Sequence, residues 1–164
     1  MVKEIFSIVN ITNQDGCFDL QFRKDTRHER TNSPTYYRWK AQFVITTSAA
    51  NKNNMDKIAK ELKCGAVSIS KDQARFSVQK IDDIVDVVIP YFNKNMLAGN
   101  KKQDFNLWAK GVEIIYQNKG KHLASWKKSD LLALIEIQKT SAKYKTKSRE
   151  PKWLEMAQAF AKTI

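Results

Sequence analysis

The sequence predicts an α+β fold in which two β-hairpins alternate with helices and further helices follow. Two observations predict it. Apolar and polar residues alternate in two pairs of segments, as they do in half-buried antiparallel strands. Before, between and after these segments, apolar residues recur three or four positions apart, as on amphipathic helices. The chain has 164 residues, of which 42% are hydrophobic, and this suits a single folded domain with an apolar core.

The elements are expected in a definite order along the chain. The periodicity predicts a helix over residues 3–11, strands over 17–23 and 36–47, a helix over 53–63, a hairpin formed by 66–70 and 74–78, and helices over 81–92, 105–116 and 131–137. A last helix is expected to begin at Pro151, because proline is favoured in a first helical turn. Gly16 is expected to end the first helix by taking a left-handed conformation.

The two faces of the predicted sheet differ in character. In the first strand Phe18, Leu20 and Phe22 alternate with polar residues, so they are expected to face the core. The opposite face is predicted to carry the candidates for nucleic-acid binding: Asp19, Gln21, Arg23, Tyr36, Arg38, Lys40, Gln42, Ser68, Ser70, Arg75 and Ser77. Arg and Gln read guanine and adenine edges in the major groove through paired hydrogen bonds. An ordinary solvated sheet face is the alternative interpretation.

The charge of the chain indicates an anionic partner. The formal net charge is +12 and the pI is about 9.7, an imbalance that adds self-repulsion to the folded state. A nucleic acid compensates it, because each Lys or Arg that neutralises a phosphate releases condensed counterions. A basic protein bound to a membrane surface is disfavoured, since no basic amphipathic helix with a continuous apolar face stands at either end.

Hydropathy and cysteine spacing argue against several other classes of protein. No apolar run approaches the ~18 residues of a membrane helix, and the first residues lack a signal-peptide core. The cysteines, Cys17 and Cys64, are far apart and form no CxxC pair, so neither a zinc ribbon nor a disulfide framework is expected. We expect a protein that works inside the cell.

Residues 8–16 resemble the signature motif of the LAGLIDADG homing endonuclease family. In that family a helix ends in an acid and a glycine, and a small and an apolar residue then open a strand; here these are Asp15, Gly16, Cys17 and Phe18. Other stretches are similar to later parts of the family: residues 40–47, 62–67, 89–92 with Leu97, 101–105 and 121–123. The resemblance spans residues 5–141 and contains one copy of the motif.

The resemblance implies an αββαββα core whose four-stranded antiparallel sheet binds DNA, with extra C-terminal helices. A single motif copy implies a homodimer, in which Ile8, Asn10 and Ile11 meet the same helix of the partner. The implied activity is that of an intron-encoded, site-specific endonuclease that hydrolyses both strands of duplex DNA with Mg²⁺.

The resemblance also assigns residues to this reaction. Asp15 is the expected metal-binding carboxylate, with the backbone carbonyl of Gln14 as a second ligand. Lys102 matches the family's basic residue near the active site, and Lys101 takes its place if the register is one residue off. The further catalytic candidates are Gln103 and Thr47. Two other interpretations stay open: Asp15 and Gly16 as a simple turn, and the lysines as phosphate contacts without a catalytic role.

Two departures from the family pattern favour an alternative function. Asn10 stands where the family has a small residue between two closely crossing helices, and overpacking costs ~1–3 kcal/mol, unless Asn10 pairs with its copy. Asn13 stands where the family has an acid. A cleavage-deficient relative that acts as an RNA-binding splicing factor or ribosome-associated protein is therefore the alternative to the endonuclease.

The domain organisation is predicted from the same comparison. We expect one endonuclease-like domain over residues 1–141 and a basic C-terminal extension with a final helix over 142–164. The stretch from Gly120 to Ile164 has ten Lys or Arg and four Asp or Glu, which suits a phosphate backbone or a solvated linker. The compartment stays open between a bacterial or archaeal cytoplasm and a mitochondrion or chloroplast, since mobile introns occur in all of them.

Overall fold

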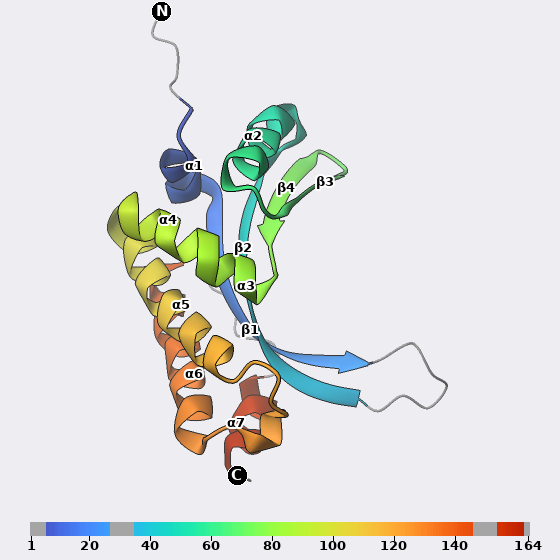
Figure 1. Cartoon of the computed structure of the whole chain (residues 1–164), viewed down its shortest axis with the longest axis vertical. Helices are drawn as coiled ribbons and strands as arrows, with labels where there is room; N and C mark the ends of the chain where they lie inside the picture. Colours follow the sequence, from blue (N-terminus) through green and yellow to red (C-terminus); the bar gives the residue numbers. More distant parts are fainter. Residues whose placement is uncertain (1–5, 27–34, 146–153, 163–164) are drawn as a thin grey trace, which may run out of the picture.

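The computed structural model describes residues 6–26, 35–145 and 154–162. Its strands form a four-stranded antiparallel sheet in the order β1-β2-β4-β3 (Figure 1). The elements are α1 (Ile8–Asp15), β1 (Gly16–Thr26), β2 (Thr35–Ser48), η1 (Ala49–Asn51), α2 (Lys52–Leu62), β3 (Ala66–Ser70), β4 (Gln73–Val78), α3 (Ile81–Asp83), η2 (Ile84–Val88), α4 (Ile89–Lys94), α5 (Gly99–Gln117), η3 (Leu123–Ser125), α6 (Lys128–Ser141), η4 (Ala142–Tyr144) and α7 (Leu154–Lys162). The predicted α+β fold with an αββαββα core is confirmed.

The sheet is curved, and helices cover its convex face. Figure 1 shows α4, α5 and α6 along one side of β1 and β2, while the concave side is left open. The predicted alternation is confirmed, because Phe18, Leu20 and Phe22 of β1 are buried beneath the helices. The polar residues between them therefore lie on the open side.

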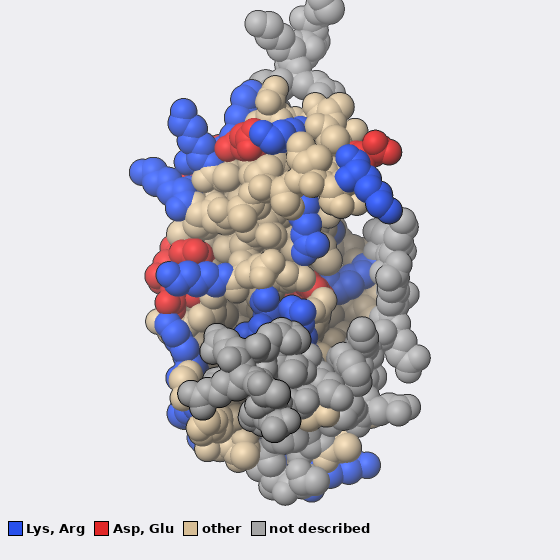
Figure 2. Space-filling model, turned by 90° about the vertical axis from the view of Figure 1, so that its right-hand side faces the viewer, with Lys and Arg blue, Asp and Glu red and all other residues tan. Residues whose placement is uncertain are grey.

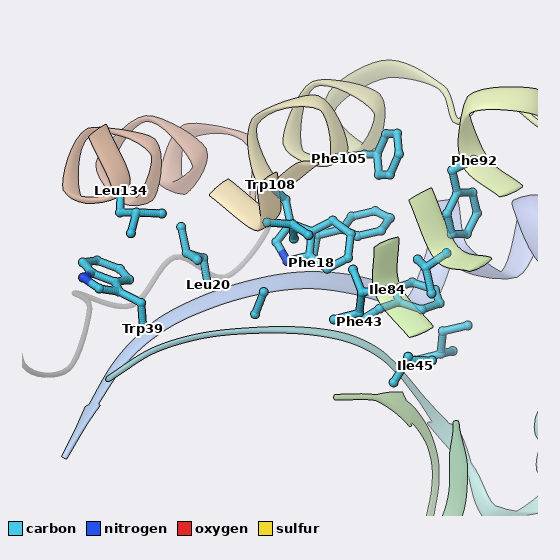
Figure 3. Close-up of a cluster of buried hydrophobic side chains, with 14 of the residues drawn as sticks. Phe18, Leu20, Trp39, Phe43, Ile45, Ile84, Phe92, Phe105, Trp108 and Leu134 are labelled. Atoms are coloured by element: carbon cyan, nitrogen blue, oxygen red, sulfur yellow. The ribbon is translucent and has the colours of Figure 1, made fainter. Parts of the chain in front are cut away.

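An aromatic cluster fills the space between the sheet and the helices (Figure 3). Phe18 is 1% exposed, and its ring centroid lies 5.2 Å from those of Phe43 and Phe105 and 5.0 Å from that of Trp108. Phe92 of α4 packs edge-on against Phe18 at 5.7 Å. Truncating a core aromatic residue costs about 3–5 kcal/mol, so this cluster fixes β1 beneath α5.

The first helix begins and ends later than predicted. It starts after Ser7, whose Oγ accepts a hydrogen bond from the backbone N–H of Asn10 at 3.2 Å, and it continues to Asp15. The expectation of a left-handed Gly16 is wrong, because Gly16 is extended with φ −79° and ψ 151°. A glycine is needed there for space: a Cβ would lie 2.7 Å from both Cγ2 and the carbonyl oxygen of Thr12. Residues 3–5 of the predicted helix lie outside the described residues.

The helical run predicted over residues 81–92 is present and continues to Lys94, but it contains a wide turn. Residues Ile84–Val88 form a π-helical segment, in which the backbone N–H of Ile89 donates to the carbonyl of Ile84. Pro90 follows directly. Because Pro90 has no N–H and its ring conflicts with the carbonyl four residues earlier, the wider turn accommodates it inside a continuous run.

The C-terminal helices pack on the same core. Tyr116, in the last turn of α5, is 42% exposed. Ala157 and Ala161 of α7 are buried in the common core, and α7 packs on α6. Pro151, the predicted start of the last helix, lies outside the described residues. The division between residues 1–141 and 142–164 stays a prediction.

Candidate active site and nucleic-acid interface

The junction between α1 and β1 presents the predicted metal-binding carboxylate to solvent. Asp15 is the last residue of α1, and both Asp15 and Gln14 are exposed. The close approach of Gly16 to Thr12 lets the chain turn directly from helix into strand. Asp15 thereby stands at the end of the strand that carries the polar sheet face. The carbonyl end of a helix carries partial negative charge, which favours a nearby cation.

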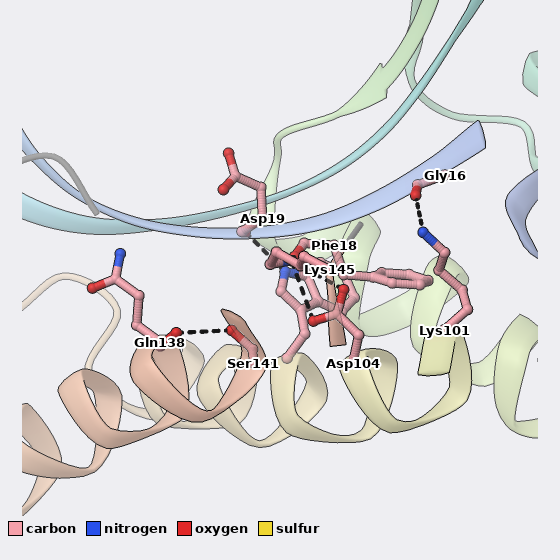
Figure 4. Close-up of polar contacts among 9 residues, drawn as sticks. Gly16, Phe18, Asp19, Lys101, Asp104, Gln138, Ser141 and Lys145 are labelled. Atoms are coloured by element: carbon pink, nitrogen blue, oxygen red, sulfur yellow. Dashed lines mark hydrogen bonds and ion pairs between the residues drawn. The ribbon is translucent and has the colours of Figure 1, made fainter. Parts of the chain in front are cut away.

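The structure brings Lys101, rather than Lys102, to this junction. The amino group of Lys101, in the first turn of α5, donates a hydrogen bond to the backbone carbonyl of Gly16 (Figure 4). Consecutive helical residues point about 100° apart, so Lys102 cannot reach the same carbonyl from the same direction. Lys101 is thus the lysine whose amino group lies next to the residue that follows Asp15, and the catalytic role of either lysine stays a prediction.

The other two catalytic candidates stand elsewhere. Thr47 pairs with the buried Ala74 in the β2–β4 register, which places it on the helix-covered side of the sheet. Its Oγ1 accepts a hydrogen bond from Nδ2 of Asn51 at 3.1 Å, so its local contact is with the turn that leads into α2. Gln103 is exposed on α5. Their catalytic roles stay predictions to which the described contacts add no support.

Side chains from α5, α6 and the residue after η4 bond the carbonyls of β1 next to this junction, a feature that sequence reasoning missed. Nζ of Lys145 donates to the carbonyl of Phe18 at 2.8 Å, Nε1 of Trp108 to that of Asp19 at 2.9 Å, and Nε2 of Gln138 to that of Leu20 at 2.9 Å. Together with Lys101 they fix β1, which is an edge strand of the sheet. No local sequence pattern signals these contacts, because each joins residues far apart along the chain.

A buried ion pair accompanies these bonds. Nζ of Lys145 lies 3.0 Å from Oδ2 of Asp104, a carboxylate that is 2% exposed (Figure 4). Burial raises the pKa of Asp104 above its ordinary value, and the positive charge of Lys145 opposes the shift. The sequence suggested that the basic stretch around residue 145 meets phosphates, but Lys145 is committed to this internal pair.

The open face of the sheet carries the predicted nucleic-acid-binding residues side by side. The β1–β2 register pairs Gln21 with Lys40 and Arg23 with Arg38. In the second hairpin Ser68 lies opposite Arg75. Ser70 and Ser77 share this face; Ser70 is exposed and Ser77 is half-buried. Figure 2 shows this side of the molecule, where Lys and Arg are more prominent than Asp and Glu. The backbone of Tyr36 pairs with Asp25, but its side chain lies outside the described residues.

The contact pattern corrects one residue of the predicted dimer interface. Ile8 is only 2% exposed and packs in the core of its own chain, so it has no surface to offer a partner. Asn10 is exposed and Ile11 is half-buried on α1. Asn13 has an internal role, because its Oδ1 accepts a hydrogen bond from the backbone N–H of Ala98 at 3.1 Å.

Asp15 is not part of a larger ligand cluster within one chain. Among the described residues, no group of three or more His, Cys, Asp or Glu is placed to hold a metal ion. A divalent cation at Asp15 therefore requires ligands from outside this set, such as backbone carbonyls, water, DNA or a second motif.

None of the helices in the described part of the chain has the length and apolar character needed to cross a membrane.

A family model described as LAGLIDADG endonuclease matches residues 11–112, which is more than half of the chain. The chain belongs to the LAGLIDADG endonuclease family. The matched region of this LAGLIDADG chain contains Asp15, the whole sheet and Lys101. The predicted family is thus confirmed.

Two curated relatives of this LAGLIDADG chain are fungal. It is 30% identical over 130 residues to "Probable intron-encoded DNA endonuclease 1" of Mycosarcoma maydis, a match that covers 79% of this chain and 43% of the relative. It is 31% identical over 88 residues to "Probable intron-encoded endonuclease 3" of Neurospora crassa, covering 52% of this chain and 16% of the relative. The chain spans less than half the length of these relatives.

Solved structures share the fold. The homing endonuclease I-TnaI superimposes with a TM-score of 0.69 at 17% identity, and the match covers 94% of this chain and 95% of I-TnaI. The K262A mutant of I-SmaMI gives a TM-score of 0.72 at 15% identity, covering 93% of this chain and 47% of that one. The meganuclease I-AabMI bound to uncleaved DNA gives 0.69 at 19% identity, covering 93% and 47%.

Proposed function

We propose that this LAGLIDADG chain works as a site-specific double-stranded DNA endonuclease. The observation that carries the proposal is the junction of α1 and β1, where Asp15 is exposed and the amino group of Lys101 bonds the carbonyl of the next residue, Gly16. The family and the fungal relatives described as intron-encoded endonucleases support it.

The concave sheet face is the proposed binding surface for the duplex. A twisted β-ribbon fits the major groove, where base edges present distinct patterns of donors and acceptors. Arg23, Arg38 and Lys40 supply positive charge on this face, and Gln21 and Gln42 supply amides for base contacts. The structures of I-SmaMI and I-AabMI, which share the fold, contain bound DNA.

Asp15 fits a Mg²⁺ site by its donor chemistry. Mg²⁺ prefers carboxylate, carbonyl and water oxygens and keeps several waters, and the exposed Asp15 carboxylate with the backbone carbonyl of Gln14 offers such donors. A bound Mg²⁺ would activate a water molecule and stabilise the leaving oxygen during phosphodiester hydrolysis. Lys101 would hold a positive charge beside the scissile phosphate, where it stabilises developing negative charge.

Cleavage of both strands requires a second motif. One chain supplies one such carboxylate, so we propose that a second copy of this chain contributes its own Asp15 across a two-fold axis. The two copies would meet along the exposed side of α1, which carries Asn10. An isologous contact of this kind places identical residues opposite each other, so the two Asn10 side chains would face each other.

The substitution Asp15→Asn tests the proposal. We expect the variant to lose cleavage of a selected DNA site by at least about two orders of magnitude, because a metal ligand is lost, while its affinity for that site stays within about twofold. The measurement is cleavage of a labelled duplex with Mg²⁺, beside a binding assay without Mg²⁺. Asp56→Asn, at an exposed carboxylate on α2, is the control with the same change of charge. Undiminished cleavage by the Asp15 variant would refute the assigned role.

An RNA-binding function is the second candidate, and the exposed Asn10 is the observation that favours it. A bulky polar residue on the outer side of α1 hinders close approach of a second α1 and would leave half an active site. In that case the basic sheet would bind structured RNA more tightly than duplex DNA at physiological salt. A direct competition between the two nucleic acids decides between these functions.

A further inference from the structure

Asp19 is an acid on an otherwise basic surface. Over the paired stretch from Cys17 to Arg23 of β1 and from Arg38 to Val44 of β2, Asp19 is the single acidic residue on the open face. Figure 4 shows its carboxylate on the side of β1 that faces away from the helices. A carboxylate there repels phosphates, so its presence on the proposed DNA-binding face calls for a partner that donates hydrogen bonds.

Two glutamines are held by this carboxylate. Nε2 of Gln42, directly opposite on β2, donates to Oδ2 of Asp19 at 2.8 Å, and Nε2 of Gln21 donates to the same oxygen at 2.5 Å. A carboxylate only accepts hydrogen bonds. It therefore fixes which end of each amide turns toward Asp19: the nitrogen end lies at the carboxylate, and the oxygen end is directed elsewhere.

This arrangement determines which bases the side chains of Asp19, Gln21 and Gln42 can recognise by hydrogen bonds in the major groove. Ionised Asp accepts from the N4 amino group of cytosine, and Gln pairs with adenine by accepting from its N6 amino group. Guanine and thymine present an oxygen acceptor at the corresponding place in the major groove. That oxygen would face acceptor oxygens of the protein, and two acceptors form no hydrogen bond with each other.

We infer that Asp19, Gln21 and Gln42 form an acceptor cluster that sets base specificity, selecting adenine or cytosine on one DNA strand against guanine and thymine. Asp19 acts partly through the glutamines, as their positioning residue. The inference rests on the proposed function, because it requires duplex DNA on the concave sheet face.

The position of the affected base pair follows from the geometry of β1. Asp19 lies three residues along β1 from Gly16, the residue that follows Asp15. At about 3.3 Å per strand residue this is about 10 Å, or about three base pairs of B-DNA. The acceptor cluster therefore acts on base pairs close to the cleavage centre and leaves the outer part of the site unaffected.

The test is a binding-site selection from a randomised duplex library without Mg²⁺, which reports binding and not cleavage. We expect the wild-type chain to prefer adenine or cytosine at one or two adjacent positions of each half-site. Asp19→Asn should reduce this preference about tenfold at those positions only, because the new amide can donate as well as accept. Gln42→Ala should alter the same positions. The affinity of both variants for unrelated DNA should not fall.

Asp86→Asn is the matched control, since Asp86 is exposed on the helical side of the molecule and the change of charge is the same. Asp19→Asn would overturn the inference if it left every base preference intact, so that its only effect was a uniform rise in affinity for all sequences. A wild-type chain that selects no DNA sequence at all would instead refute the proposed function, and the inference would fall with it.

Discussion

At the scale of single residues, Lys101 is distinguished from Lys102 by one contact. The sequence leaves the catalytic lysine open between two neighbours, because a family resemblance aligns a basic pair equally well in either register. Because the amino group of Lys101 bonds the carbonyl of Gly16, we propose Lys101 for this role. A long-range contact of this kind joins residues in α5 and β1 and leaves no trace in the local sequence.

The two lysines provide their own matched pair for a test. Lys101→Met should lower the rate of DNA cleavage by about 10²-fold or more, because a preorganised positive charge beside the transition state is lost. Lys102→Met removes the same charge one residue away and should lower the rate less than about fivefold, at the level expected for a phosphate contact. The measurement is single-turnover cleavage at saturating protein. Equal losses in both variants would contradict the assignment.

Other residues show how far sequence reasoning reaches. The inward positions of Phe18 and Leu20 were predicted correctly, because strand alternation is a local property that burial of one face imposes. Ile8 was assigned to an interface and turned out to be buried in its own chain, since helical periodicity alone does not say which side of α1 meets the sheet. Asn13 departs from the family pattern, yet it bonds Ala98 and so keeps an internal role.

At the scale of elements, β1 is held by its strand partner and by side chains. It pairs with β2, and its backbone carbonyls also accept hydrogen bonds from side chains of α5, α6 and the residue after η4. These donors fix the strand that carries Asp19 and begins directly after Asp15.

The pair of Lys145 and Asp104 allows this role to be measured. Lys145→Met should lower the free energy of unfolding by about 3 kcal/mol at neutral pH, because it leaves a buried carboxylate without its counterion. Burial already raises the pKa of Asp104, and loss of Lys145 raises that pKa further. The destabilisation should therefore grow as the pH rises through the raised pKa and shrink in acid, where Asp104 is protonated in both proteins.

Denaturant unfolding of the wild type and the variant over a range of pH measures this difference. The double variant Asp104→Asn, Lys145→Met is the control, and it should recover part of the lost stability, with little dependence on pH between about 4 and 7. A destabilisation by Lys145→Met that is constant over this range would show that packing of the side chain, and not its charge, stabilises the site.

Element boundaries were predicted less well than element types. The end of α1 was placed too early because Asn13 and Gly16 are helix-breaking signals, whereas Asn13 stays helical and accepts a long-range hydrogen bond from Ala98. The helical run through Pro90 was predicted correctly, but the π-helical turn before it was not. Such a turn depends on how the backbone accommodates the ring of proline, which apolar periodicity does not report.

At the scale of the whole molecule, the number of chains decides whether a complete active site exists. The family resemblance predicts a homodimer, and the single chain has one Asp15 at an exposed helix end. We expect light scattering to give the mass of two chains at micromolar concentration. Asn10→Gly, which restores a small residue at the helix crossing, should leave the dimer intact or tighten it, since overpacking is relieved.

Asn10→Arg is the opposing variant in this experiment, because two like charges at a two-fold axis repel each other. It should shift the mass toward one chain and reduce double-strand cleavage in parallel. A wild-type chain that keeps the mass of a monomer at every concentration would contradict the homodimer and direct attention to the RNA-binding alternative.

The long β1–β2 hairpin has a consequence for how often a genome would be cut. β1 has 11 residues and extends past the helices (Figure 1). At about 3.3 Å per residue it follows about ten base pairs of duplex, so two copies would follow about twenty. Each base pair read in full contributes two bits of information, and the length of one hairpin thereby sets the rarity of the target. An acceptor cluster that admits two bases of four would give up one bit at its position in each half-site, so two copies would recognise about four times as many sites and would tolerate some sequence drift in the target.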